Sequence, residues 1–212
     1  EYDNIFQIVE RFYSIFGIEY SYRLGTRPES YLGDVKTWNK AEATLEQILK
    51  KNKKPYTVAE KDGAFYGPKV DILIKDVIGR EWQLGTIQLD FQQPRRFELE
   101  YIAADGKKKT PVVIHRVIYG SLERFIAILI EHFAGAFPLW LAPVQVVILP
   151  ISDEQNGYAE KVASELRTTV RGLRLEIDDR SESIGRKIRD AELLKIPYML
   201  IIGEKEQKQK TV

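Results

Sequence analysis

The 212-residue sequence contains no cysteine. Disulfides and thiolate metal sites are therefore excluded within these residues, and such a sequence fits a reducing compartment, so we expect a cytoplasmic protein. Charge of one sign is also lacking, since 32 Lys and Arg stand against 31 Asp and Glu. A net charge of +1 creates no overall field toward nucleic acid. Any RNA binding would have to come from local basic patches.

Long apolar runs are missing as well. No uncharged stretch approaches the ~18 residues of a membrane span, so we expect none. Residue 1 is not Met, lies inside a helical pattern and has no signal-peptide layout, which suggests a part of a longer protein. With 44% hydrophobic and 30% charged residues, the chain has the composition of a folded domain or two.

The first part of the chain predicts an α+β domain. Apolar residues recur at helical spacing from Ile5 to Phe16 and stop at Gly17, and residues 38–50 form a second amphipathic pattern. Short apolar runs separated by turn signals follow, which favours an antiparallel sheet. The runs cover residues 70–74, 82–91, 97–103 and 112–119. The last run is apolar on both faces, so we expect a central strand.

A helix should follow over residues 122–133. Its core-facing side would contain Leu122, Phe125, Ile126, Leu129, Ile130 and Phe133.

The C-terminal part predicts a small parallel α/β domain, because apolar strands alternate with helices. The strands are expected at residues 144–151, 173–177 and 197–202. Ser152 and Gln155 form a capping box for a helix that turns Tyr158, Val162 and Leu166 inward, and residues 184–195 form the next helix. Residues 204–212 resemble an incomplete hairpin.

Residues 111–125 carry the most informative pattern. A strand leads through Gly120-Ser121 into a helix with Arg124 in its first turn. A cation there opposes the helix dipole and costs roughly a few tenths of a kcal/mol unless an anion lies beside it. This predicts a phosphate site. The alternative is a surface arginine paired with Glu123 or Asp105, which composition by itself favours.

Two further patterns point to a site. Gln83, Thr86 and Gln88 are expected on one face of a strand, which would make either a site floor or an exposed sheet face. His115 lies within a strand, where a lone histidine is more often a hydrogen-bonded core residue than a metal ligand.

Five blocks together resemble the C-terminal half of the threonyl-tRNA synthetase family of class II. They are LGTRPE (24–29), GAFYGPK (63–69), EWQLGTIQLDF (81–91), VVIHRVIYGSLERF (112–125) and FPLWLAPVQVVILPI (137–151). The resemblance implies an antiparallel class II sheet with helices at 1–141, the C-terminal part of a catalytic domain. It implies a truncated α/β anticodon-binding domain at 142–212.

The resemblance also implies roles for single residues. Arg124 would be the motif 3 arginine that binds the ATP phosphates, with Ser121 as a helix cap or a ligand contact. Gln83 and Thr86 would hold adenosine, Gln88 and Tyr66 would lie near threonine, and Lys69 would lie at the adenylate end. Lys69 could equally be a solvated charge after Pro68.

A zinc ion and Mg²⁺ with ATP are the cofactors that the resemblance implies. His115 would be one zinc ligand, whose cysteine and second histidine partners lie outside this chain. In the family the zinc separates threonine from valine, since a site that coordinates a hydroxyl rejects the analogue lacking it.

The implied reaction joins threonine and ATP to threonyl-adenylate and transfers threonine to tRNA(Thr). Motifs 1 and 2 are absent, so we expect no activity from this chain by itself, whereas the parent would be a homodimer. Candidate tRNA contacts are Arg180, Arg186, Lys187 and Arg189. They could also form a solvated basic face balanced by nearby acids.

Two rival interpretations remain. One is another class II synthetase of the same subgroup, such as a prolyl or glycyl enzyme. The other is a non-catalytic RNA-binding or regulatory protein related to the synthetases.

Overall fold

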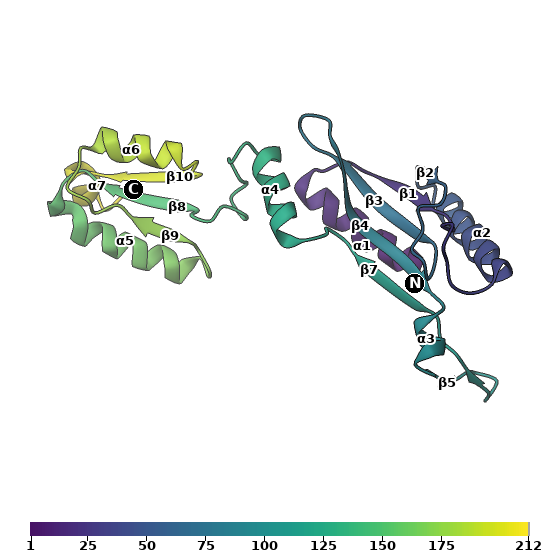
Figure 1. Ribbon diagram of the computed structural model, residues 1–212. Helices are drawn as coiled ribbons and strands as arrows, with labels where there is room; N and C mark the ends of the chain where they lie inside the picture. Colours follow the sequence, from purple (N-terminus) through teal and green to yellow (C-terminus); the bar gives the residue numbers. More distant parts are fainter. Residues whose placement is uncertain (212) are drawn as a thin grey trace. The chain divides into compact units, whose positions relative to one another are not determined.

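The computed structural model describes residues 1–211. The chain forms two compact units, Glu1–Ile128 and Leu129–Val212, each considered by itself below (Figure 1). Within the described residues, no helix has both the length and the apolar character needed to cross a membrane.

The first unit is built on a five-stranded sheet with the order β2-β1-β3-β4-β7. Strands β1, β3, β4 and β7 pair antiparallel as expected, whereas β2 adds parallel to β1. The strands are β1 (Tyr20–Gly25), β2 (Tyr56–Ala59), β3 (Lys69–Lys75), β4 (Glu81–Asp90) and β7 (Val113–Val117).

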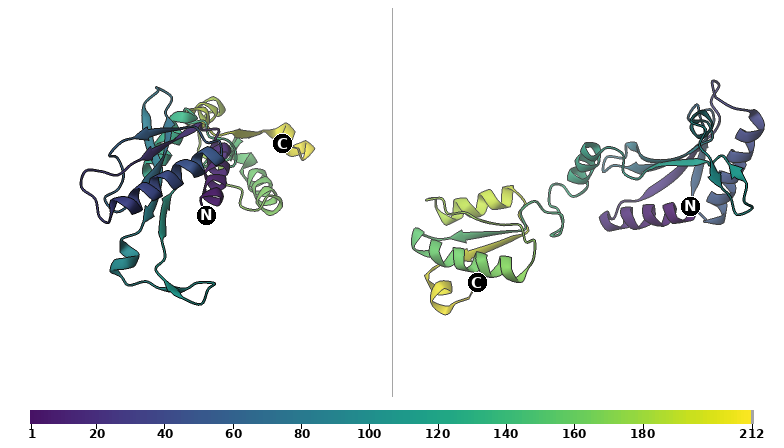
Figure 2. Two further views of the ribbon diagram at one scale, coloured as in Figure 1. Left: turned by 90° about the vertical axis from the view of Figure 1, so that its right-hand side faces the viewer. Right: turned by 90° about the horizontal axis from the view of Figure 1, so that it is seen from below.

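Two amphipathic helices cover one side of this sheet, α1 (Tyr2–Phe16) and α2 (Val35–Lys51) (Figure 2). Helix α1 ends, as predicted, at Gly17, which has the left-handed φ of 66° that glycine adopts readily. Phe6 of α1 is buried against Tyr22, with ring centroids 5.0 Å apart. The apolar face of the sheet is thus closed, and polar side chains gather on the opposite face.

A β-bulge in β4 determines which side chains share that polar face. Ile72 of β3 pairs with Gly85, but the next residue, Leu73, pairs with Gln83. The extra residue, Leu84, breaks the two-residue alternation of a strand. Gln83 and Thr86, three positions apart, consequently lie on the same face.

The expectation of a central strand at 112–119 was wrong. Strand β7 is at the end of the strand order in the described part of the chain, and Val112 and Val117 are 50% and 41% exposed. Apolar composition indicates covered faces, and it does not reveal whether a strand has neighbours on both edges.

Residues 97–103 also differ from the expected strand. The short helix α3 (Gln93–Arg96) precedes them, and only β5 (Tyr101–Ile102) is extended, paired with β6 (Lys108–Lys109). Phe97 is 72% exposed, so the apolar composition of this segment does not mark a buried strand.

Helix α4 (Leu122–His132) forms as predicted but buries a narrower stripe. Phe125 and Leu129 are buried, whereas Leu122, Ile126 and Ile130 are 57%, 45% and 47% exposed. The buried side is fixed by aromatic contacts within the first unit, because the Phe125 ring packs on the rings of α1.

The second unit is a three-stranded parallel sheet with the order β10-β8-β9, confirming the α/β prediction. Its elements are β8 (Val146–Pro150), the 3₁₀ turn η1 (Asp153–Gln155), α5 (Asn156–Thr169), β9 (Leu175–Ile177), α6 (Ile184–Leu193) and β10 (Tyr198–Ile202). Helix α5 packs on one core around Ile148, with Tyr158, Val162 and Leu166 in that core. Helix α6 supplies Ala191 to the other, around Leu149.

Two helix starts in this unit are capped. The Ser152 backbone amide donates to Gln155 Oε1 at 3.1 Å, as the capping box predicts. The expected hairpin after residue 203 was wrong, because Glu204–Gln209 forms helix α7. The Glu206 carboxylate accepts from the Gly203 amide at 3.0 Å, which stabilises a helix start at this point. Val212 lies outside the described residues.

Candidate functional site

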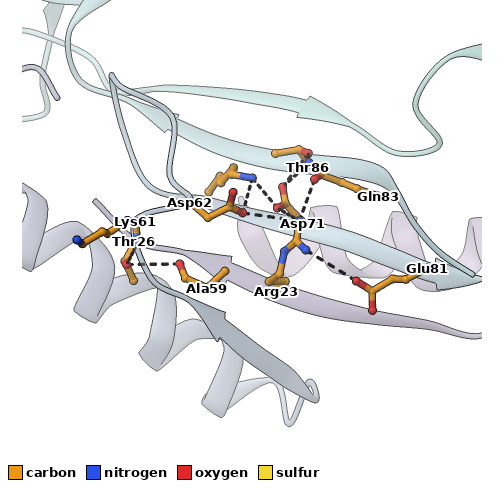
Figure 3. A network of polar contacts seen from close by, with 10 residues as sticks. Arg23, Thr26, Ala59, Lys61, Asp62, Asp71, Glu81, Gln83 and Thr86 are labelled. Atoms are coloured by element: carbon orange, nitrogen blue, oxygen red, sulfur yellow. Dashed lines mark hydrogen bonds and ion pairs between the residues drawn. The ribbon is translucent and has the colours of Figure 1, made fainter. Parts of the chain in front are cut away.

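A buried carboxylate lies at the centre of the polar face. Asp71 of β3 is fully buried, and its Oδ1 accepts hydrogen bonds from Gln83 Nε2 at 2.9 Å and Thr86 Oγ1 at 3.0 Å (Figure 3). Gln83 Nε2 also lies 3.0 Å from Thr86 Oγ1. Asp71, which the sequence interpretation missed, therefore brings together Gln83 and Thr86, the two residues predicted to hold adenosine.

The second oxygen of Asp71 binds two cations. Lys69 Nζ donates to Oδ2 at 2.6 Å, and an Arg23 amino group donates to it at 3.2 Å. Lys69 also donates to Asp62 at 3.0 Å, and Arg23 donates to Gln83 Oε1 at 2.9 Å. The alternative that Lys69 is a solvated charge was wrong, because only 9% of this residue is exposed.

The strand register explains why these residues meet. Asp71 pairs with Thr86, and Lys69 pairs with Gln88, so the side chains of each pair stand on one face. The loop before β3 approaches closely at Gly67, where a Cβ would lie 1.7 Å from the Leu89 carbonyl oxygen. Only glycine permits this approach.

The close approach of that loop brings Tyr66 over the end of the polar face. Its hydroxyl donates to Gln88 Oε1. Gln88 in turn pairs with His115 across β4 and β7, and the rings of Tyr66 and His115 are 5.8 Å apart between centroids. The predicted threonine-side residues thus form one group with the predicted zinc ligand.

A second buried carboxylate, Asp90, supports His115. His115 Nε2 lies 2.9 Å from Asp90 Oδ2, and Asp90 is fully buried. Burial would raise the pKa of Asp90, but the His115 contact and the backbone amides of Gln93 and Gln92 outweigh it and lower that pKa. A carboxylate on one imidazole nitrogen is typical of zinc-binding histidines.

His115 therefore is a candidate for one ligand of a metal ion, and the described residues do not complete a metal site around it. In residues 1–211, no three His, Cys, Asp or Glu side chains gather as a metal site would require.

Arg124 takes a position that the sequence patterns did not predict. Its guanidinium lies over the Trp82 ring, 5.6 Å from the centroid, and its backbone amide donates to Ser121 Oγ at 3.3 Å. Ser121 thus acts as a helix cap. Asp105, one of the two proposed surface partners of Arg124, instead pairs with Lys109 at 2.9 Å.

Trp82 is the residue before Gln83, but Arg124 contacts its ring and not the Asp71 cluster. Trp82 pairs with Ile74, toward the opposite end of the β3–β4 pairing from Lys69 and Gln88. Arg124 itself is exposed.

The four candidate tRNA cations of the second unit do not form one free patch. Arg180 donates to Asp178 at 2.8 and 2.7 Å and to Asp190 at 3.0 Å, which raises the Arg180 pKa and lowers that of Asp178. Lys187 is 3% exposed and donates to the Pro150 carbonyl at 3.0 Å.

The remaining two cations are exposed. Arg186 pairs with Glu182 at 3.2 Å, and Arg189 is open to solvent. A groove of about 550 Å³ lies beside helix α6. Its lining includes Asp178, Arg180, Lys187, Asp190 and Leu194. The alternative of a basic face balanced by acids describes Arg180 and Arg186 well.

Family models match both units. Residues 1–133 match the tRNA synthetase class II core domain (G, H, P, S and T), which is more than half of the chain. The chain belongs to the class II tRNA synthetases. Residues 145–212 match the anticodon binding domain.

Relatives of this class II chain include the threonine–tRNA ligases of two bacteria. That of Caldanaerobacter subterraneus subsp. tengcongensis is 57% identical over 208 residues, covering 98% of this chain and 32% of the ligase. That of Natranaerobius thermophilus is 52% identical over 212 residues, covering 100% and 33%. The class II chain thus spans about a third of the length of the curated relatives it matches, and it corresponds to their C-terminal portion.

Solved structures of threonyl-tRNA synthetases are also similar to this chain. The RNA binding domain of threonyl-tRNA synthetase from Cryptosporidium parvum Iowa II superimposes with a TM-score of 0.90 at 40% identity, covering 97% of this chain and 51% of that one. A putative threonyl-tRNA synthetase from Aeropyrum pernix gives 0.68 at 26% identity, covering 96% and 51%.

Several candidate site residues of this class II chain escaped sequence interpretation, namely Arg23, Asp71, Trp82 and Asp90. Asp71 did leave a signal, since it is a lone acid inside the apolar run of β3. A charged residue in a buried strand must be paired, and this requirement could have identified it.

Proposed function

We propose that this chain supplies part of the active site and the anticodon-binding module of a threonine–tRNA ligase. The observation that supports it most is the polar face of the sheet, where Lys69, Gln83 and Thr86 converge on one buried carboxylate. This face occurs in a chain 57% identical to a threonine–tRNA ligase. The parent would act in the cytoplasm as a homodimer.

In this proposal the carboxylate of threonine attacks the α-phosphate of ATP and displaces pyrophosphate, which gives threonyl-adenylate. A hydroxyl of the terminal ribose of tRNA(Thr) then attacks the threonyl carbonyl and AMP leaves. Gln83 and Thr86 hold adenosine, while Lys69 lies at the adenylate end. Arg124, exposed beside Trp82, neutralises phosphate charge, and Mg²⁺ accompanies the nucleotide. Such catalysis depends on positioning, which a rigid sheet favours.

Tyr66, Gln88 and His115 would form the threonine side of the cavity. A bound zinc would supply a coordination position for the substrate hydroxyl, with its other protein ligands outside this chain. His115 would hold one zinc position through the nitrogen that does not face Asp90. Arg189 and Arg186 would contact the tRNA backbone.

Threonine-dependent exchange of pyrophosphate into ATP tests this function in the full-length gene product that contains this chain. We expect exchange with threonine and not with valine, and none from residues 1–212 by themselves. Exchange with proline or glycine in place of threonine would contradict the assignment. So would robust tRNA binding without any exchange, as expected of a non-catalytic RNA-binding protein.

Arg124→Ala provides a residue-level check in the same protein. Loss of a charged hydrogen-bond donor to phosphate should weaken ATP binding about ten- to a hundredfold, measured by calorimetry with a non-hydrolysable analogue. Arg116→Ala removes an exposed arginine from β7 and serves as the control. Equal ATP affinities in the two variants would exclude Arg124 from the phosphate site.

A further inference from the structure

We propose that Asp71 is a positioning residue that fixes Lys69, Gln83 and Thr86 before substrates arrive. This inference rests on the proposed function and extends it to a residue that would not itself touch the substrate. Four side chains donate to this one carboxylate, from β1, β3 and β4. Figure 3 shows Asp71 at the centre of these contacts.

The two oxygens of Asp71 serve two halves of the face. Oδ1 accepts from Gln83 and Thr86, the proposed adenosine residues. Oδ2 accepts from Lys69 at the proposed adenylate end, and from Arg23. One rigid group thereby sets the spacing between the two halves.

Charge balance gives the first reason. The side chains of Lys69 and Arg23 are 11% and 26% exposed, and both cations are within 3.2 Å of the same oxygen. Arg23 Nε is buried without a hydrogen-bond partner in the described structure, so the guanidinium depends on its remaining contacts. Without Asp71, the two partly buried cations would keep only Asp62 and Glu81 as counter-charges, whose side chains are 45% and 50% exposed, and they would repel each other more strongly.

Entropy gives the second reason. Lys, Arg and Gln side chains lose considerable rotamer freedom when they are fixed. Contacts to a buried carboxylate on a central strand fix these side chains in the free protein. Substrate binding therefore does not have to supply the free energy for ordering them. Asp71 is well suited because its own backbone pairs on both sides, with β1 and with β4.

Asp71→Asn tests the inference, because the amide has the same shape but can accept on one edge only. In the full-length gene product we expect kcat/KM for pyrophosphate exchange to fall about ten- to a hundredfold, the effect of losing charged hydrogen bonds. Both a higher KM for ATP and a lower kcat should contribute. The control is Glu46→Gln on α2, a carboxylate that also accepts from two side chains, Lys50 and Tyr56.

A Lys69→Met background separates positioning from a merely structural role. There, Asp71→Asn should still raise the KM for ATP, through Gln83 and Thr86, but should lower kcat no further. This pair also gives the answer if Asp71→Asn alone fails to fold, because it removes the more deeply buried of the two cations, Lys69, together with the anion. The unsubstituted protein reports on the proposed function separately.

Two results would overturn the inference. One is an Asp71→Asn protein with the kinetics of the Glu46→Gln control. The other is a kcat that falls by the same factor whether or not Lys69 is present.

Discussion

At the residue scale, buried carboxylates organise the first unit. Asp71 and Asp90 are fully buried and each fixes a group of candidate site residues. Asp76 does the same for the turn between β3 and β4, where it accepts from the Trp82 indole at 2.8 Å and the Arg80 amide at 2.8 Å. Trp82 in turn supports Arg124.

Asp76 should make the fold sensitive to acid. Burial would raise its pKa, but hydrogen bonds from Trp82, Arg80 and Ile78 outweigh this and lower the pKa to about 2. A carboxyl whose pKa is lower in the folded state stabilises the protein above its unfolded pKa, near 3.8, and loses this contribution as the pH falls toward 2. Asp76→Asn should therefore be less stable at pH 7, with the difference vanishing near pH 2.

Urea unfolding of both proteins between pH 7 and pH 2 measures this. The exposed carboxylate of Asp105, whose pKa is also lowered through Lys109, offers a control in Asp105→Asn, which should change little because surface pairs contribute little. A constant gap between wild type and Asp76→Asn over the whole pH range would contradict the linkage.

At the element scale, close backbone contacts decide the shape of the site. The bulge in β4 turns Gln83 to the side of Thr86, and Gly67 lets the Tyr66 loop approach β4. Neither feature adds a chemical group. Each places existing groups within hydrogen-bonding distance.

Gly67→Ala should displace the Tyr66 loop, because the new Cβ would collide with the Leu89 carbonyl. We expect a loss of about 1–3 kcal/mol in the free energy of unfolding, typical of backbone strain and overpacking. Gly157→Ala gives the opposite expectation. Gly157 lies in helix α5 with open space around it, so alanine should stabilise by up to about 1 kcal/mol.

Thermal unfolding of the two variants checks both signs. A Gly67→Ala protein as stable as Gly157→Ala would mean that the loop tolerates the side chain and that Gly67 is not required for the approach.

At the scale of the whole molecule, each unit has its own sheet and core. The second unit closes both faces of its three-stranded sheet, with α5 on one and α6 on the other. Its core residues, such as Ile148 and Leu149, are fully buried within that unit. A domain with two covered faces can fold by itself.

Residues 134–212 expressed alone should therefore fold cooperatively. Circular dichroism should show α/β secondary structure and a single sigmoidal melt. The isolated segment should also bind tRNA(Thr) more weakly than the full-length gene product, since it lacks the other contacts. A featureless spectrum or a gradual melt would show that this unit depends on the rest of the protein.

Some elements could be predicted from the sequence and others could not. The helices at 2–16, 35–51 and 156–169 follow from apolar periodicity, because each buries one regular face. The strands of the second unit follow from continuous apolar runs, because both faces of that sheet are covered. The expected hairpin after residue 203 failed, since the Gly203–Glu206 cap competes with a turn over the same residues. Strand β7 was expected at the centre of the sheet but lies at its edge in the described residues. The sequence of a single strand does not show which strands pair with it.

The sequence by itself determined the family, the succession of elements and most of the candidate side chains, since these depend on local pattern and on blocks of neighbouring residues. The tertiary structure decided which groups meet. Asp71 gathers residues from three strands, a bulge turns Gln83 toward Thr86, and salt bridges engage Arg180. These outcomes depend on register and on burial, which arise only when segments distant in the chain pack together and exclude water.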